Sequence, residues 1–277
     1  MERFLTVTIS NLLTMHKACI LFLLFCNILA FPQTYRSIPN TAFIRGEKLS
    51  FRIAFNSALT GNITGGKATL EVTKEKKILN NRTTYHVIGE GKTTGFIEIF
   101  YKIHDRFESY FDQEALIAWQ FTRRTRENNY KKDDLVLFRQ NDRLAVSMTK
   151  IMKVPANIQD VISAFYYART LDVSDIKTGG TIEIPFFLDD SVYHSRVIFK
   201  GRETVKTKLG KFRCIAFMPM VATGYAFDDP YPITIWITDD ANRLPILIES
   251  EQPVGRARVE LTSYSGLANP ITAKLPD

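Results

Sequence analysis

An acidic side chain interrupts an apolar pattern in the segment from Gly95 to Phe111. Alternate residues are apolar as far as Ile103, and the next position on that face is Asp105. The following segment carries Arg123 on an otherwise apolar face. If a three-residue turn at 113–115 joins two strands here, the two side chains lie opposite each other, and the guanidinium compensates the cost of burying a carboxylate. This pattern predicts a structural ion pair, a bulge that turns Asp105 outward, or a pair that faces a ligand; the turn lacks the glycine that short turns favour, which weakens the register.

The residue types needed for nucleophilic or zinc chemistry are scattered along the chain. The sequence has no Gly-x-Ser-x-Gly motif, and Cys214 stands in the apolar segment RCIAF, where an inert buried thiol is expected. His86, His104 and His194 are too widely spaced for the usual zinc ligand sets. We therefore expect no catalytic residue, no metal site and no cofactor.

Two loops resemble binding motifs only superficially. The segment DDANR at Asp239 lacks the alternating acidic ligands and the glycine of a calcium loop. The segment GEGKTTG at 89–95 lacks the first glycine of a phosphate-binding loop. Both are predicted to be hairpin turns.

Aromatic residues are the most prominent remaining group. The chain has 20 Phe and 11 Tyr, and several lie in a helical segment that includes Phe165 and Tyr166. Such side chains form a core, or line a pocket for an acyl chain or a sugar. The candidate ligand-binding residues are Asp105, Arg123, Asp160, Tyr166, Arg169 and Trp236.

These residues must be positioned mainly by β-strands. Apolar and polar residues alternate in roughly thirteen segments, which predicts strands with one buried and one solvated face. Clear examples are 49–55, 68–72 and 257–261, and turn signals such as Asn80-Asn81 separate the segments. The spacing predicts a mainly antiparallel sheet.

One segment has helical periodicity instead. Apolar residues between Asn157 and Asp172 recur every three or four positions, which predicts a helix of about four turns. Asn157 is expected to cap it, Asp160 to lie near its N-terminus and Arg169 in its last turn. The fold class is therefore mainly β: a large curled antiparallel sheet, or an open or closed barrel-like roll, with one amphipathic helix packed on it.

The N-terminal residues are typical of an export signal. The apolar run from Ala18 to Phe31 follows Lys17 and is too short for a membrane span of about 20 residues. We predict a signal peptide over 1–33, with a true start at Met15 as an option, and a single β-rich domain over 34–277. An uncleaved anchor, or a lipid anchor on Cys26, are the alternatives. Cleavage would leave a periplasmic or extracellular protein with no integral membrane span.

Composition restricts the class of partner. The 277 residues are 45% hydrophobic and 23% charged, which excludes disordered, collagen-like and coiled-coil chains. The formal net charge is +7 without a dense basic cluster, so no nucleic-acid partner is expected. The sequence gives no indication of an oligomeric state.

Several blocks of sequence resemble one known family. These blocks are GEKLSFRI, GFIEIFYKIHDRFESYFD, IQDVISAFYYARTLD, KGRETVKTKLGKFRCIAFMP and ITIWITDDANRLPILIES, in this order from about Gly46 to Gly266. Together they resemble the bacterial exported family known as domain of unknown function 3108. The resemblance implies export, a single β-rich domain and no established activity, and it carries over no residue role.

Three functional hypotheses follow. The first is a non-enzymatic binding or structural protein of the cell envelope, with a groove for an amphiphilic lipid or a glycan-like ligand. The second is an envelope hydrolase that uses paired carboxylates, such as Asp105 with Glu108 or Glu203, which would have to face each other across a cleft. The third is an outer-membrane β-barrel; charged residues that fill one face of a strand, such as Lys48 and Arg52, count against it.

Overall fold

The computed structural model describes residues 35–57, 61–221, 230–252 and 255–276. The predicted signal peptide, its optional start at Met15 and its cysteines lie outside the described residues. The chain from Arg36 onward forms one compact unit.

In the described part of the chain, fifteen strands form one antiparallel sheet. The strands are β1 (Lys48–Ser57), β2 (Gly61–Val72), β3 (Lys77–Leu79), β4 (Arg82–Thr93), β5 (His104–Asp112), β6 (Ala118–Glu127), β7 (Tyr130–Arg139), β8 (Leu144–Val146), β9 (Ile151–Lys153), β10 (Thr181–Leu188), β11 (Ser191–Thr207), β12 (Gly210–Pro219), β13 (Ile233–Thr238), β14 (Pro245–Gln252) and β15 (Gly255–Ser265). The helices are α2 (Phe96–Phe100) and α3 (Val161–Ala168). The predicted mainly β, antiparallel fold class is confirmed, and the described residues contain two helices instead of the one expected.

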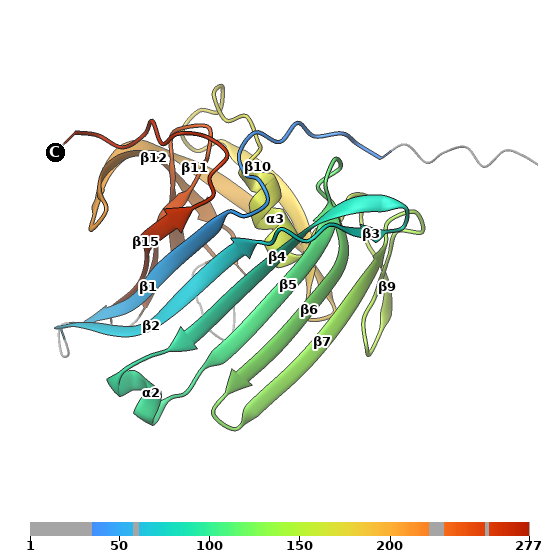
Figure 1. Ribbon diagram of the computed structural model, residues 1–277, viewed down its shortest axis with the longest axis horizontal. Coiled ribbons are helices and arrows are strands. Elements are labelled where there is room, and N and C mark those ends of the chain that lie inside the picture. The colour runs from blue at the N-terminus through green and yellow to red at the C-terminus, as the bar shows by residue number, and fades with distance from the viewer. Residues whose placement is uncertain (1–34, 58–60, 222–229, 253–254, 277) are drawn as a thin grey trace, which may run out of the picture. The chain divides into compact units, whose positions relative to one another are not determined.

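The sheet is open, but its two edges are brought together. Its path runs from β10 through β15, β1 and β2 to β9, so that β10 and β9 are the edge strands. The segment after β9 bridges them: Gln159 pairs with Phe186 of β10, and the carbonyl of Ile158 accepts a hydrogen bond of 3.3 Å from the amide of Ala118 in β6. Helix α3 follows this bridge and packs against both β10 and β5, on the inside of the curved sheet (Figure 1).

The strand connections of an antiparallel sheet alternate between its two ends. The connections β4–β5, β6–β7, β10–β11 and β12–β13 therefore lie at one end, and because the first of them contains α2, we call it the α2 end. Figure 1 shows α2 at the tip of β4 and β5, beside the β6–β7 turn. The start of β1 and the β13–β14 turn lie at the opposite end.

Alternation along β1 follows the prediction only in its first half. Leu49 and Phe51 are buried, but the next fully buried residue is Ala54, not Ile53. The pairing with β2 shifts register between Ile53 and Ala54, and such a bulge moves the following side chains to the opposite face.

The segment from Gly95 to Phe111 is not one continuous strand, contrary to the prediction. Gly95 has a φ of +63°, and the following residues form the short helix α2 before β5 begins at His104. Because Ile99 and Tyr101 on the predicted apolar face are 76% and 46% exposed, the alternation that predicted a strand here did not reflect a buried face.

The predicted long helix is shorter than its apolar stripe. Asn157 has a φ of +60° and does not cap the helix; the cap is Asp160. Ile158 is fully buried but belongs to the bridge between the sheet edges, whose extended pairing with β10 is incompatible with a helical backbone. Of the apolar stripe, Ile158 and Ile162 are buried, whereas Val161 is 37% exposed, and the helix is about two turns shorter than predicted.

Candidate functional site

A cavity of about 310 Å³ lies between α3 and the inner face of β10–β13. Ala164 and Phe165 contribute from the helix, Ile182 and Ile184 from β10, and Ile235 and Ile237 from β13. This volume falls within the range of about 300–1,000 Å³ that is usual for small-molecule sites. Its walls are almost entirely aliphatic and aromatic.

The cavity exists because the helix presents small side chains to the sheet. Val161, Ala164, Phe165 and Ala168 form one stripe at the spacing of three and four that a helix requires, and all four line the cavity. Two alanines in such a stripe leave space that larger residues would fill. The predicted apolar stripe of this helix included Ala168 but not Ala164, although the two alanines are four residues apart in the sequence.

The two polar side chains on the cavity wall already have partners. The Ser195 hydroxyl donates a hydrogen bond of 3.1 Å to the carbonyl of Met220, and Arg169 is paired with Glu47. In the described residues the cavity therefore offers apolar contact without a free polar group that would orient a head group. Such a site suits a hydrocarbon chain better than a sugar, whose hydroxyls need hydrogen-bond partners.

Arg169 is buried and paired with Glu47. Its Nη1 and Nη2 atoms lie 2.6 and 2.8 Å from the two carboxylate oxygens of Glu47, and both side chains are almost completely buried. Nη2 also donates to the carbonyls of Ala42 and Asn242, at 3.2 and 2.9 Å. Burial lowers the pKa of the guanidinium, but the hydrogen bonds and charge of Glu47 outweigh it and raise the pKa above its ordinary value. The pair attaches the end of α3 to the start of β1 and to the β13–β14 turn.

Tyr166 lies on the opposite side of α3 from the cavity and is fully buried. Its ring packs edge-on against Phe43, with centroids 4.7 Å apart, and also contacts Phe111. Its hydroxyl donates a long hydrogen bond of 3.5 Å to Glu47. The structure thus places this candidate ligand-binding residue in the core.

Asp160 begins α3 and is completely buried. One carboxylate oxygen accepts hydrogen bonds from the amides of Ile162 and Ser163, at 2.8 and 2.9 Å, and the other accepts one of 2.6 Å from the hydroxyl of Ser109 in β5. Burial raises the pKa of Asp160 to about 6, although the hydrogen bonds from Ser109 and the helix amides oppose this rise. Asp160 therefore fixes the helix that forms one wall of the cavity.

Asp105 and Arg123 do not pair, so the predicted register is wrong. Phe107 faces Arg123, and Asp105 instead accepts a hydrogen bond of 2.9 Å from the amide of Arg126. The β5–β6 pairing shifts register between Tyr110 and Phe111, and the connection is longer than a three-residue turn. These local irregularities leave no signal in residue alternation.

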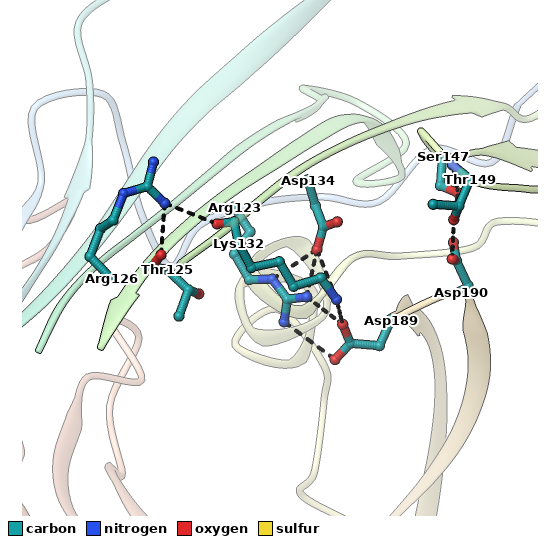
Figure 2. Close-up of polar contacts among 9 residues, drawn as sticks. All are labelled: Arg123, Thr125, Arg126, Lys132, Asp134, Ser147, Thr149, Asp189 and Asp190. Carbon is teal, nitrogen blue, oxygen red and sulfur yellow. Dashed lines mark hydrogen bonds and ion pairs between the residues drawn. The ribbon is translucent and has the colours of Figure 1, made fainter. Parts of the chain in front are cut away.

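Arg123 instead takes part in an ion network that links two distant parts of the curled sheet (Figure 2). Its guanidinium binds Asp134 of β7, at 2.5 Å, and Asp189 of the β10–β11 turn. Lys132 binds the same two carboxylates, at 3.3 and 2.5 Å. The network connects β6 and β7 to the turn that ends β10, and a hydrogen bond from Thr149 to Asp190 adds a second link beside it.

Trp236 lies on β13 but does not line the cavity. Its indole N–H donates a hydrogen bond of 2.7 Å to Glu203 of β11, and the Lys200 ammonium lies 5.9 Å from its ring centroid. Of the six candidate ligand-binding residues, only Arg169 borders the cavity.

The acidic residues considered for hydrolysis have separate partners. Glu108 lies 2.9 Å from Nε2 of His86 and 2.7 Å from Arg106, whereas Glu203 binds Trp236 on a distant strand. Nδ1 of His86 lies 2.7 Å from Glu75, so both ring nitrogens are occupied. In the described segments no group of three or more His, Cys, Asp or Glu side chains is arranged to hold a metal ion.

Comparisons with known proteins give no activity, and a solved structure with a TM-score above 0.5 supports the fold. A search of curated proteins finds no match. A solved structure described as a β-barrel-like protein of domain of unknown function DUF1849 from Brucella abortus has a TM-score of 0.54 at 8% identity, covering 84% of this chain and 99% of that one. Two others, a candidate lipoprotein from Parabacteroides distasonis and a candidate exported protein with a YmcC-like fold from Bacteroides fragilis, each cover 84% of this chain and all of their own, at 11% and 10% identity and TM-scores of 0.35 and 0.33.

The helices of the described residues include none that is long and apolar enough to cross a membrane. The profile of the family described as "Protein of unknown function (DUF3108)" matches residues 50–262, which is most of the chain and contains α3 and the strands that line the cavity. The chain therefore belongs to the DUF3108 family, and the resemblance found in its sequence blocks is confirmed.

Proposed function

We propose that this protein is a non-enzymatic binding protein of the cell envelope whose cavity between α3 and β10–β13 holds the hydrocarbon chain of an amphiphile. The observation that carries the proposal is the cavity itself, with its volume of about 310 Å³ and its apolar walls. Filling it with a hydrocarbon chain removes apolar surface of both partners from water, which is favourable by about 25 cal/mol per Å² before the costs of association.

The surroundings of the cavity support a preformed site. One wall is a helix fixed at its start by the hydrogen bonds of Asp160 and at its end by the ion pair of Arg169 with Glu47. The other wall is hydrogen-bonded sheet from β10 to β13. A rigid cavity loses little conformational entropy when it binds a ligand.

Export to the cell envelope is part of the proposal. Its support is the apolar run from Ala18 to Phe31 and the description of two structural neighbours as a candidate lipoprotein and a candidate exported protein. An envelope protein would meet acylated amphiphiles in the compartment that the signal peptide implies.

The experiment compares two identical substitutions in the full chain. Val197 of β11 lines the cavity, whereas Val146 of β8 does not. We expect Val197→Phe to weaken binding of cis-parinaric acid, a fluorescent long-chain fatty acid, by about tenfold or more, because the added ring occupies the space of the chain. We expect Val146→Phe to bind like the unsubstituted protein.

Native mass spectrometry of the purified protein gives a second measurement. An amphiphile bound to the unsubstituted chain should appear as added mass and should be recovered by organic extraction. Val197→Phe should carry less of it. Recovery of empty protein that also fails to bind cis-parinaric acid would refute the proposal, as would equal affinity of the two variants.

A further inference from the structure

The helix α2 forms an exposed apolar projection at the α2 end of the sheet. Phe96, Ile99 and Phe100 are 67%, 76% and 67% exposed, although side chains of this size are usually buried in soluble proteins. The rings of Phe96 and Phe100 pack edge-on against each other, with centroids 4.7 Å apart. Tyr130, in the neighbouring β6–β7 hairpin, is 55% exposed and extends the apolar surface.

Contacts with β2 and with the β6–β7 turn hold α2 in place. Ile97 packs over Gly65 of β2, where a β-carbon added to the glycine would lie only 3.4 Å from the isoleucine side chain. Lys102 and Asn128 exchange two hydrogen bonds of 2.8 Å, which tie the end of α2 to the β6–β7 turn. The apolar side chains are therefore presented outward by an ordered support and do not belong to a loose loop.

Lysines surround the projection. Lys92, Lys102 and Lys131 are all exposed, and the structure pairs none of the three with a carboxylate within the residues that it describes. Three acids lie nearby. Glu98 is on α2 itself, Glu127 accepts a hydrogen bond of 3.4 Å from Tyr101, and Glu90 interacts electrostatically with Lys92 but pairs with His104 and Arg106. The chain as a whole carries a formal charge of +7. Aromatic side chains flanked by lysines are typical of segments that lie at a membrane interface.

The cavity reaches the same end of the sheet. Of its lining residues, Val161 and Met220 are exposed, and Met220 directly follows β12 in a connection at the α2 end. A flat surface held against α2 would therefore lie at the same end of the sheet as Met220, an exposed residue of the cavity wall.

We propose that α2, with Tyr130 and the flanking lysines, docks this protein on a lipid bilayer that contains anionic lipids. The projection consists of three apolar side chains of α2 and Tyr130, far fewer than the roughly 20–30 residues that each partner contributes to a stable protein–protein interface. It does suit shallow insertion, since a few large apolar side chains beside basic residues give reversible membrane binding. Docking itself is independent of the proposed function. Only its purpose, which is to place the cavity beside a source of amphiphiles, rests on that function.

The test uses a local probe, so that membrane contacts made elsewhere in the full chain do not affect the result. Phe100 on α2 and Ile78 in β3, at the opposite end of the sheet, are equally exposed, at 67% and 69%. We expect the added fluorescence of Phe100→Trp to be quenched by vesicles of brominated phosphatidylcholine that contain one third phosphatidylglycerol. We expect that of Ile78→Trp to stay unquenched. Equal quenching of the two, or none in either, would overturn the proposal.

Two further variants test the contributions of insertion and charge. Phe96→Ser with Phe100→Ser should weaken vesicle binding by about a hundredfold, at about tenfold for each large side chain removed from the interface. Lys102→Gln should lower the preference for phosphatidylglycerol vesicles about fivefold. If the double variant instead dissolves a dimer and leaves vesicle binding unchanged, the projection is an interface between copies of this chain, and the membrane proposal is wrong.

These variants also separate docking from ligand binding. None of their residues lines the cavity, so they should bind cis-parinaric acid in the absence of vesicles as the unsubstituted chain does. Val197→Phe should show the opposite pattern, with normal vesicle docking and weak fatty-acid binding. Failure of one proposal therefore leaves a different signature from failure of the other.

Discussion

Removal of the Arg169 side chain should destabilise the protein severely. Arg169→Met keeps most of the volume of the side chain but leaves the Glu47 carboxylate, which is 0% exposed, without its counter-charge. Loss of one partner of a buried ion pair costs about 3–5 kcal/mol. The carbonyls of Ala42 and Asn242 also lose a donor, at about 1 kcal/mol each. The expected loss of about 5–7 kcal/mol is a large share of the roughly 5–15 kcal/mol that stabilises a typical domain.

Urea unfolding followed by circular dichroism measures this loss. The matched variant Arg169→Met with Glu47→Leu should recover much of it, because no isolated charge then remains buried. A chain in which Arg169→Met lowers the free energy of unfolding by less than about 1 kcal/mol and abolishes fatty-acid binding would refute this reasoning. Arg169 would then be a ligand-binding residue, as the sequence analysis predicted.

Three other expectations follow from the buried and paired groups. The pKa of Asp160 is about 6 in the folded chain and about 4 in the unfolded chain. The shift therefore contributes about 3 kcal/mol to stability below about pH 4, and this contribution is lost as the pH rises through 6. Asp160→Asn should remove this component from the pH dependence of urea unfolding. A double-mutant cycle of Arg123→Ala and Asp189→Ala should give a coupling energy of about 1 kcal/mol that falls in high salt, since the pair is partly exposed; a salt-independent value would contradict a surface ion network. Burial raises the pKa of the Cys214 thiol to about 12, so this thiol should react with iodoacetamide at pH 8 only after the protein unfolds. The unfolded Cys214→Ser variant should then take up one label fewer than the unfolded unsubstituted chain.

Residue alternation predicted the class of fold because burial acts on each strand locally. Leu49 and Phe51 are buried as their spacing requires, and the stripe of Val161, Phe165 and Ala168 does form one face of a helix. The helix boundary was predicted less well. Asn157 and Asp160 are both good caps, and the choice between them depends on the pairing of Gln159 with a strand that follows later in the chain.

The candidate site could not be predicted to the same extent, because it depends on distant contacts and on irregular positions. One of the two partners of Arg123 is Asp189, 66 residues away, in a turn that the curling of the sheet brings near. The cavity lies between Ala164 of α3 and strands β10–β13, so its volume depends on several segments and cannot be predicted from one of them. The exposed residues of α2 were predicted to lie in a strand for a different reason: apolar side chains that face solvent have the same alternation as those that face a core.

The pairing of β1 with β15 joins the two ends of the sequence. Arg52 and Glu260 form an ion pair of 2.9 Å across this ladder, although 208 residues separate them. Such distant partners make folding slow, because a long loop must close before the contact is gained. In a chain that emerges N-terminus first, one edge of β1 would stay unpaired until β15 emerged. A truncation before Gly255 would expose backbone donors and acceptors on both β1 and β14, and such open edges promote aggregation.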